Sequence, residues 1–391
     1  MMKEIDYEKL LMIPGPTMVS SEVLNTMAYP VIGHRTEEFR ILLEDTIEKM
    51  KKVFITQGDV YIITGSGTAA MDMAIANTVE KGDKVLTICN GNFGERFSKI
   101  VEVYKGDVVK LEYPWGRGAR PEDVKRILEE NPDIKAVTVV HNETSTGVRN
   151  PIKEIGEIVK DYNALYIVDT VSSLGGDYVD VDRFHIDICV TGSQKCLGAP
   201  PGVSAISISE KAWDVINSTE SKSFYLDIKA YRDRFESKRE SPYTPAVPLI
   251  YALNKALDRV LEEGLENRVK RHERMARATV AGLEAMGIEL FAEEWARSIT
   301  VTSAKYPEGI EDKKFRGILS NKYKVVIAGG QGQVSGKIFR IGHMGEVREI
   351  HILGTLAAIE MAFKELGYEA SGGVDAAKDI LGTACTIDSN I

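Results

Sequence analysis

Residues 165–176 read LYIVDTVSSLGG, and this stretch decides the fold. Four apolar or aromatic residues in succession lead to Asp169, and small residues and glycines follow at once. A run that is apolar on consecutive positions is typical of a strand in a parallel sheet covered on both faces. The carboxyl ends of such strands are where open α/β sheets bind their ligands. The stretch therefore predicts a buried strand that brings Asp169 to a ligand site.

The same kind of run recurs on both sides of this stretch, from about residue 55 to residue 210, with helical patterns between the runs. The other strand candidates are residues 60–63, 84–89, 108–112, 136–140, 186–190 and 203–208. The helix candidates between them are residues 68–80, 96–104, 121–130 and 152–162. Alternating strands and helices predict a doubly wound α/β domain.

The chain beyond residue 240 has a different pattern. Three prolines within residues 241–248 predict a connection and not a helix. A long helical pattern follows and breaks near Gly264, and the later part reads as strand, helix, strand, strand, helix. We expect an N-terminal segment at residues 1–20, a large domain at 21–264 and a smaller α+β domain at 265–391. The small, polar residues of the tail, 371–391, predict weak packing.

Composition limits the classes of function. The 391 residues carry a formal net charge of −9, which argues against a nucleic-acid-binding face. The polar start gives no sign of a secretory signal, and no apolar run reaches the length of a membrane span, so we expect a cytoplasmic enzyme. The four cysteines form no CxxC pair, so neither a disulfide framework nor a metal site is expected. Cys89 and Cys189 lie in apolar runs and are predicted to be buried free thiols.

A glycine-rich turn at residues 64–70, TGSGTAA, separates a predicted strand from a predicted helix. Glycines let the backbone approach a ligand closely, and the free amides of a helix start attract an anion. The hydroxyls of Ser66 and Thr68 add donors, so a phosphate is the expected ligand. Two alternatives stay open for the same letters, a dinucleotide fingerprint and a simple tight turn.

Two charged residues follow predicted strands. A buried Asp169 needs a partner, such as a protonated ring nitrogen, or else it caps a turn through Ser172 or Ser173. Lys195 is the lone charge in residues 191–202, TGSQKCLGAPPG. Desolvation lowers the pKa of a lysine and frees its amine to attack a carbonyl, whereas a solvated loop lysine is the ordinary alternative.

Arg340 interrupts an apolar run at residues 336–342, GKIFRIG, in the predicted smaller domain. A guanidinium in this position can bind a carboxylate with two parallel hydrogen bonds, or it can form a structural ion pair. A phosphate cradle, a buried acid, an aldehyde-accepting lysine and a carboxylate clamp together are what pyridoxal 5′-phosphate chemistry on an amino acid requires. The combination therefore predicts that cofactor and an amino-acid substrate.

With these motifs in place, the chain resembles the class V, fold type I aminotransferases of the alanine–glyoxylate, serine–pyruvate and serine–glyoxylate branch. Ten segments carry the resemblance: residues 14–17, 33–35, 65–68, 90–94, 141–147, 169–176, 192–195, 199–202, 223–227 and 336–342. It implies a large domain with a mostly parallel seven-stranded sheet, a smaller C-terminal α+β domain, and a homodimer with shared active sites.

The resemblance also implies a role for each matched residue. Lys195 would carry the cofactor as a Schiff base, and Asp169 would contact the pyridine nitrogen. The other cofactor contacts would be Ser66, Gly67, Thr68, Phe93, Thr144, Val171, Gln194, Tyr243 and Thr244, with Thr244 reaching the phosphate of the neighbouring subunit. The substrate would meet Arg340 at its α-carboxylate, and Gly33, His34 and Arg35 nearby.

Three positions depart from the pattern of the family. Phe93 stands where many relatives carry Trp, so ring stacking should persist over a smaller area. Thr68 stands where His is common. The tyrosine that often accompanies Thr244 is out of register, and Tyr243 is the nearest substitute.

Competing functions need features that the sequence lacks or holds in another place. A nicotinamide-dependent dehydrogenase needs an acid after the second strand, but that strand ends at Cys89 and Asn90. A cysteine desulfurase needs a late nucleophilic cysteine, for which Cys385 is the candidate. A catalytically silent accessory subunit is a third alternative. An aspartate or phosphoserine aminotransferase needs a second cationic anchor, which Arg35 would supply; we prefer transfer from alanine or serine to glyoxylate or pyruvate.

Overall fold

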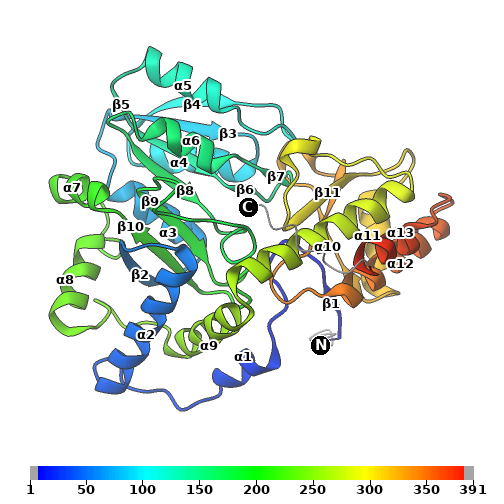
Figure 1. Cartoon of the computed structure of the whole chain (residues 1–391), viewed down its shortest axis with the longest axis horizontal. Helices are drawn as coiled ribbons and strands as arrows, with labels where there is room; N and C mark the ends of the chain where they lie inside the picture. The colour runs from blue at the N-terminus through cyan, green and yellow to red at the C-terminus, as the bar shows by residue number, and fades with distance from the viewer. Residues whose placement is uncertain (1–7, 383–391) are drawn as a thin grey trace, which may run out of the picture.

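The computed structural model describes residues 8–382, and a seven-stranded sheet forms its larger half (Figure 1). The strand order is β2-β10-β9-β8-β5-β3-β4, and all neighbours are parallel except β10, which is antiparallel to both of its partners. The strands are β2 (Asp59–Thr64), β3 (Lys84–Cys89), β4 (Asp107–Glu112), β5 (Ile134–Val140), β8 (Leu165–Asp169), β9 (Ile188–Gly192) and β10 (Val203–Ile208). The predicted mostly parallel sheet is confirmed, with each predicted strand in it.

Helices cover both faces of this sheet, as the uninterrupted apolar runs require. One hydrophobic cluster packs one face under α2 (Glu37–Phe54), α5 (Pro121–Glu130), α6 (Ile152–Val159) and α9 (Val247–Glu263). A second cluster packs the other face under α3 (Gly67–Ala76), α4 (Asn92–Val103), α7 (Glu210–Ser218) and α8 (Ile228–Lys238). The sheet is therefore buried on both sides.

The C-terminal part contains a small antiparallel sheet in the order β11-β14-β13. Its strands are β11 (Val301–Lys305), β13 (Ala328–Gly329) and β14 (Ile338–Gly342), and its helices are α10 (Leu265–Ala285), α11 (Asp312–Asn321) and α12 (Glu349–Glu365). A third hydrophobic cluster joins these helices to the sheet. This order matches the predicted strand, helix, strands and helix.

The N-terminal segment packs on this C-terminal part. Strand β1 (Leu10–Leu11) pairs in parallel with β12 (Val325–Val326), and Met12 is fully buried in the third cluster. The chain then passes through α1 (Ser21–Thr26) to the large sheet. Residues 12–17 consequently run past both the small sheet and the ends of the large one.

Two sequence expectations were wrong. The start of the tail packs well: α13 (Gly373–Gly382) lies against α10, and Ala377 is fully buried. Glycines permit this contact, since a Cβ on Gly282 would lie 2.9 Å from the carbonyl oxygen of Gly373. The predicted connection at residues 241–248 ends early, because α9 begins at Val247 and the first helical turn tolerates a proline.

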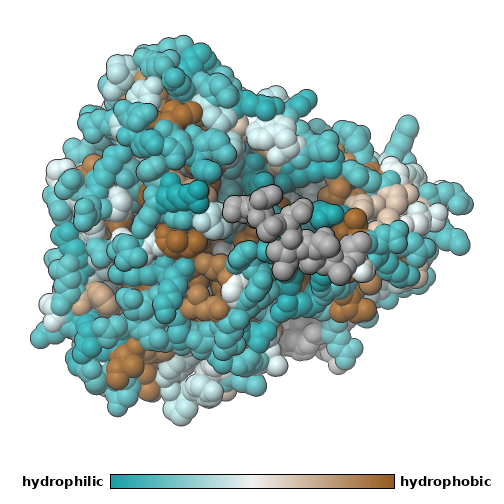
Figure 2. Space-filling model, in the orientation of Figure 1, coloured by the Kyte–Doolittle hydropathy of each residue, from teal (hydrophilic) through white to brown (hydrophobic). Residues whose placement is uncertain are grey.

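The surface in Figure 2 is mostly hydrophilic, with hydrophobic residues exposed in small groups. Within residues 8–382, no helix combines the length and the apolar character that crossing a membrane would need. Cys89 and Cys189 are buried free thiols, as predicted. Cys385, on which the desulfurase alternative depends, lies outside the described residues.

Candidate active site

Lys195 lies three residues after β9, in a loop that contacts the N-terminal segment. Its Nζ donates a hydrogen bond to the carbonyl oxygen of Pro14, and a Cβ on Gly15 would collide with the same amine. Burial lowers the pKa of the Lys195 ammonium to about 8, and the positive charges of Arg340 and Arg96 act in the same direction. The side chain is thus a desolvated amine and not a solvated loop lysine.

The backbone around Lys195 is held from several sides. Thr17 donates from its Oγ1 to the carbonyl oxygen of Lys195 (3.0 Å) and from its N–H to that of Gln194 (3.0 Å). Ser193 Oγ donates to the carbonyl oxygen of Pro200 (2.6 Å). These bonds fix the direction in which the lysine side chain leaves the loop.

Asp169 ends β8, and its side chain is almost fully buried. It accepts a hydrogen bond from the N–H of Val171 (2.7 Å), not from Ser172 or Ser173. Burial raises the pKa of its carboxyl group to about 7. No ion pair reaches this carboxylate within the part of the chain that the structure describes. The second oxygen can therefore receive an N–H from a bound molecule.

The glycine-rich turn lies directly beside these residues. Ser66 caps α3 without a side-chain hydrogen bond to the amides of residues 67–69, as far as the described residues show. A Cβ on Gly67 would lie 2.5 Å from a methyl group of Val171. Gln194 Oε1 is buried close to Gly192, and within residues 8–382 it has no hydrogen-bond partner. The open helix start fits an anionic group, whereas the free Oε1 of Gln194 is an acceptor and needs a donor.

Phe93 sits in the first turn of α4. The guanidinium of Arg96 stacks on its ring at 4.5 Å and donates from Nη1 to Thr68 Oγ1 (2.8 Å). Glu143 accepts from the backbone N–H groups of Phe93 (2.9 Å) and Gly94 (3.0 Å). The aromatic ring is therefore fixed from both its backbone and its face.

Arg340 lies on β14 with only 5% of its surface exposed, and no acidic side chain pairs with it within residues 8–382. Its guanidinium donates to the carbonyl oxygens of Thr144 (2.8 Å) and Gly329 (3.0 and 2.8 Å). Burial lowers the pKa of Arg340 to about 10, so it stays cationic at neutral pH. Three of the five N–H donors of this arginine are engaged, which leaves two for a ligand. The structural ion pair considered as an alternative is absent among these residues.

Thr144 connects the two halves of the site. Its carbonyl oxygen holds Arg340, and its hydroxyl lies 2.7 Å from the hydroxyl of Ser172, in the loop after Asp169. The structure thus links Lys195, Asp169, Val171, Gly67, Thr68, Gln194, Phe93, Thr144 and Arg340 in one neighbourhood through these contacts.

The other predicted site residues form a second group. Arg35 donates to Glu240 Oε2 (2.9 Å) and to the carbonyl oxygens of Ser241 (2.6 Å) and Pro242 (2.9 Å). His34, which follows Gly33, lies 3.3 Å from Thr244 Oγ1. In the described part of the chain, Gly33, His34, Arg35, Tyr243 and Thr244 make no hydrogen bond or ion pair with Lys195, Asp169 or Arg340.

Sequence reasoning missed Glu143 and Arg96. Glu143 is fully buried, and burial raises the pKa of its carboxyl group. The signal was present, since Glu143 is the one acidic residue among the small polar residues of 141–147, and Arg96 lies one helical turn after Phe93. Neither signal reveals the distant partners, because Glu143 binds the start of α4 and Arg96 binds Thr68 of α3.

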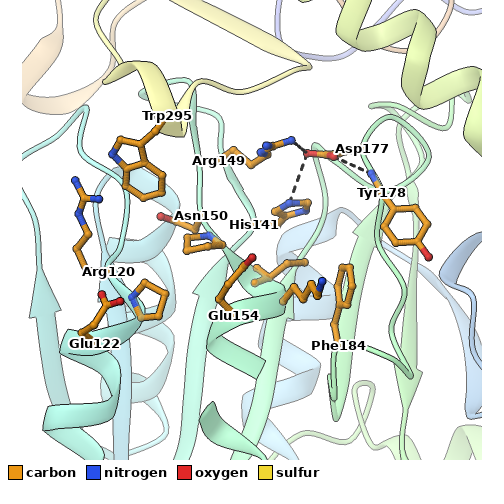
Figure 3. A pocket seen from close by; sticks show the side chains of 14 residues that line it. Arg120, Glu122, His141, Arg149, Asn150, Glu154, Asp177, Tyr178, Phe184 and Trp295 are labelled. Carbon is orange, nitrogen blue, oxygen red and sulfur yellow. Dashed lines mark hydrogen bonds and ion pairs between the residues drawn. The ribbon is translucent and has the colours of Figure 1, made fainter. Parts of the chain in front are cut away.

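A hollow of about 500 Å³ lies elsewhere, among the starts of α5 and α6 and Trp295 (Figure 3). Arg120 stacks on Trp295 at 4.2 Å, and Arg149 lies 3.5 Å from Asp177. Burial lowers the pKa of His141 in its wall to about 4. Neither Lys195 nor Arg340 lines it, and its Asp177 pairs with Arg149 and lies 3.5 Å from His141 Nε2.

A mostly parallel seven-stranded sheet with a desolvated lysine and a buried carboxyl group at its strand ends defines a fold type I aminotransferase. Residues 17–349 match the family model described as Aminotransferase class-V, and the chain belongs to this family. The family and its fold type I neighbours depend on pyridoxal 5′-phosphate.

Individual relatives cover nearly the whole chain. An uncharacterized aminotransferase of Methanocaldococcus jannaschii is 70% identical, over 97% of this chain and 99% of its own. A protein named as the small subunit of a soluble hydrogenase, from Synechococcus, is 39% identical, over 96% and 99%. Serine–glyoxylate aminotransferase of Methylorubrum extorquens is 36% identical, over 93% of each. The crystal structure of ureidoglycine–glyoxylate aminotransferase from Bacillus subtilis matches with a TM-score of 0.94 at 35% identity, over 97% and 100%.

Proposed function

We propose that the chain transfers the amino group of a small amino acid, alanine or serine, to a 2-oxo acid such as glyoxylate or pyruvate. Arg340 carries this proposal: it is a buried cation with free donors and no acidic partner among the described residues. One such arginine suits a substrate with one carboxylate. The names of the serine–glyoxylate and ureidoglycine–glyoxylate relatives support glyoxylate as the acceptor.

The residues present fit pyridoxal 5′-phosphate. Lys195 would attach the aldehyde, and Asp169 would accept the N–H of the pyridine ring. Val171 and Phe93 would pack on the two faces of the ring. The phosphate would lie at Ser66, Gly67 and Thr68, where the helix start favours an anion, with Gln194 beside it. Thr144 would add a contact. When bound, the cofactor supplies an aldehyde that accepts the amino group and a ring that withdraws electrons.

The side chains of the chain divide the remaining work. Once displaced by substrate, the amine of Lys195, with a pKa near 8, can accept the proton of the substrate α-carbon and return it. Asp169 would keep a positive charge on the ring nitrogen, because an ionised carboxylate stabilises a cationic partner. Arg340 orients the substrate by its carboxylate, which places the α-carbon toward Lys195.

We also propose a cytoplasmic homodimer in which Tyr243 and Thr244 serve the partner's site. Among the described residues they make no hydrogen bond with Lys195 of their own chain, and nearby Phe224 is 85% exposed. A surface aromatic of this size fits a subunit interface. The division into residues 1–20, 21–264 and 265–391 remains part of this proposal, with the break at Gly264 between α9 and α10 in its support.

A matrix of amino donors and keto acceptors tests the substrate class. Purified protein saturated with cofactor is mixed with each donor, and the shift of the visible cofactor band reports the half-reaction. We expect alanine and serine as donors and glyoxylate or pyruvate as acceptors, and no band shift in Lys195→Ala. Activity confined to aspartate or phosphorylated substrates would reject the proposed class, and a band indifferent to every donor would favour an accessory subunit.

A further inference from the structure

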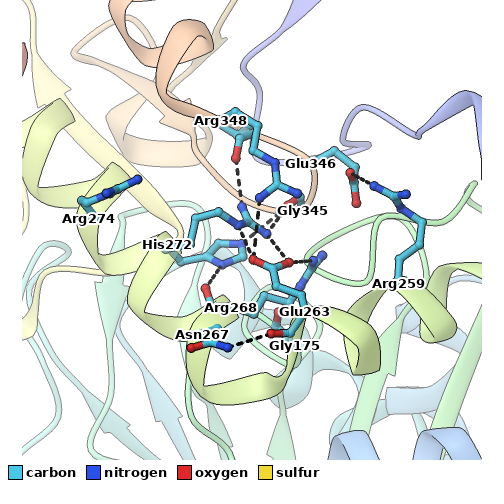
Figure 4. Close-up of polar contacts among 12 residues, drawn as sticks. Gly175, Arg259, Glu263, Asn267, Arg268, His272, Arg274, Gly345, Glu346 and Arg348 are labelled. Atoms are coloured by element: carbon cyan, nitrogen blue, oxygen red, sulfur yellow. Dashed lines mark hydrogen bonds and ion pairs between the residues drawn. The ribbon is translucent and has the colours of Figure 1, made fainter. Parts of the chain in front are cut away.

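A cluster of charged residues lies where α9 passes into α10, outside the site described above (Figure 4). Glu263 ends α9, Gly264 follows with a positive φ of 79°, and Arg268 and Arg271 lie in the first two turns of α10. Arg268 is 1% exposed, which makes it one of the largest fully buried side chains of the molecule.

One carboxylate holds both arginines. Glu263 Oε2 lies 2.6 Å from Arg268 Nη1 and 3.0 Å from Arg271 Nη2, and its Oε1 lies 2.5 Å from Arg271 Nε. Burial opposes the charge of Glu263, but hydrogen bonds from Arg271 and the charge of Arg268 lower the pKa of its carboxyl group to about 2. Each guanidinium plane is therefore fixed by a charge-assisted bond.

The remaining N–H groups of Arg268 bind backbone carbonyls of two loops of the large sheet. Nε donates to the oxygen of Gly175 (2.8 Å), in the loop that follows β8 and Asp169. Nη2 donates to the oxygen of Cys196 (2.7 Å), the residue directly after Lys195. Arg268 thus contacts the two loops that carry the proposed lysine and its acid.

Arg271 binds the C-terminal part instead. Nη1 donates to the carbonyl oxygen of Val347 (2.9 Å), and Nη2 to that of Gly345 (3.1 Å). These residues follow β14, which carries Arg340. The N–H of Gly345 also donates to His272 Nε2 (3.1 Å), while His272 Nδ1 lies 2.7 Å from the carbonyl oxygen of Arg268. The three loops of the proposed chemistry therefore meet on one pair of arginines.

We propose that Arg268 and Arg271, joined through Glu263, are positioning residues that set the spacing between the amine of Lys195 and the carboxylate clamp of Arg340. The inference rests on the proposed function, because that spacing matters only if one substrate spans both groups. A planar guanidinium that is hydrogen-bonded on both edges holds the bound segments at a fixed spacing better than a flexible ammonium does, since its donors keep a fixed geometry. Small displacements of catalytic groups by distant substitutions can cost as much as about a hundredfold in rate.

The two arginines should give different kinetic signatures. Arg271→Met releases the segment after β14, so the KM of the amino donor should rise about tenfold with kcat within about threefold. Arg268→Met releases the Lys195 loop, so kcat should fall about tenfold and the pH midpoint of the cofactor band should move. Glu263→Gln should show both effects. Lysine at either position should not rescue, because an ammonium cannot hold two loops in a fixed plane.

Arg274→Met is the matched control. Arg274 lies on the same helix and pairs with Glu349 of α12, but it touches none of the three loops. It should leave KM, kcat and the band at wild-type values. The positioning role would be overturned if folded Arg268→Lys and Arg271→Lys kept the KM, kcat and band midpoint of the wild type. This holds whatever their melting temperatures are.

Hydrogen exchange separates this inference from the proposed function. In the full-length holoenzyme, Arg268→Met or Arg268→Lys should speed amide exchange at residues 195–198, and the Arg271 variants at residues 343–347. A wild-type protein without transaminase activity would reject the proposed function, but the hydrogen-exchange rates of the variants could still be compared. Exchange equal to that of wild type and Arg274→Met in both segments would overturn the inference even if transamination is found.

Discussion

Two arginines of this chain were expected near a substrate, and their surroundings differ. Arg340 is buried with no acidic partner among residues 8–382, and its contacts are neutral carbonyl oxygens. Arg35 shares the carboxylate of Glu240 with Arg40 and Arg234. A buried cation without a counter-charge favours an anionic ligand. Arg35 already has a carboxylate partner and donates to two carbonyl oxygens, so fewer of its donors are left for a ligand. The comparison supports the proposal that Arg340 anchors the anionic group of a ligand, while Arg35 holds its own segment through Glu240, Ser241 and Pro242.

Replacing each arginine by lysine should give the largest difference in kcat/KM between the two positions. In Arg340→Lys, loss of the two-point contact should lower kcat/KM for alanine about a hundredfold or more, chiefly through KM. Arg35→Lys keeps the charge near Glu240 and should change kcat/KM by less than about threefold. Equal losses in steady-state assays of the two variants would contradict the assignment of separate roles.

Removing the counter-charge of Arg35 should have a smaller effect. Glu240 accepts from three arginines, and their hydrogen bonds outweigh burial and lower the pKa of its carboxyl group to about 2. Glu240→Gln should lower the free energy of unfolding by roughly 2 kcal/mol in urea titrations, and the released charge should improve aspartate relative to alanine as a donor. Glu44→Gln, which removes an exposed pair with Arg239, is the control and should cost about 0.5 kcal/mol or less. A ratio of the two donors that stays constant would show that Arg35 does not face the substrate.

The positive charge of Arg340 should also lower the pKa of Lys195. Only the neutral amine reacts with a carbonyl, so attachment of pyridoxal 5′-phosphate to the apoprotein should speed up as pH rises through about 8. Arg340→Met removes a nearby positive charge, so the pKa of Lys195 should rise and the midpoint should move to higher pH. Arg35→Met should leave the midpoint in place. Stopped-flow absorbance measures it, and a midpoint near that of an ordinary lysine in the wild type would contradict the desolvated site.

The strands and the residues at their ends could be predicted because both depend on local pattern. Residues 165–168 are apolar or aromatic on successive positions, and the carboxyl end of a parallel strand is a ligand position whatever surrounds it. Asp169 and Lys195 follow directly from that rule. The start of α3 was predictable for the same reason, since glycines at a strand-to-helix turn are a local signal.

The remaining features depend on segments far apart in the sequence. Glu240 lies 205 residues from Arg35, and Gly175 lies 93 residues from Arg268, so no local pattern announces either contact. The role of Glu143 could be recognised only from the structure, in which β6 (Asn142–Glu143) places its carboxylate at the start of α4. The packing of α13 was not predicted, because small residues in a terminal segment usually indicate weak packing. The contact depends on Gly282 of α10, which lies far away in the sequence.

The attachment point of the cofactor is the most direct test. Holoenzyme reduced with borohydride, digested and sequenced by mass spectrometry should carry the pyridoxyl phosphate mass on Lys195 and on no other lysine. Lys195→Ala treated in the same way should carry none and should lack the visible band. An adduct on a different lysine of the wild type, or none after saturation with cofactor, would contradict the account.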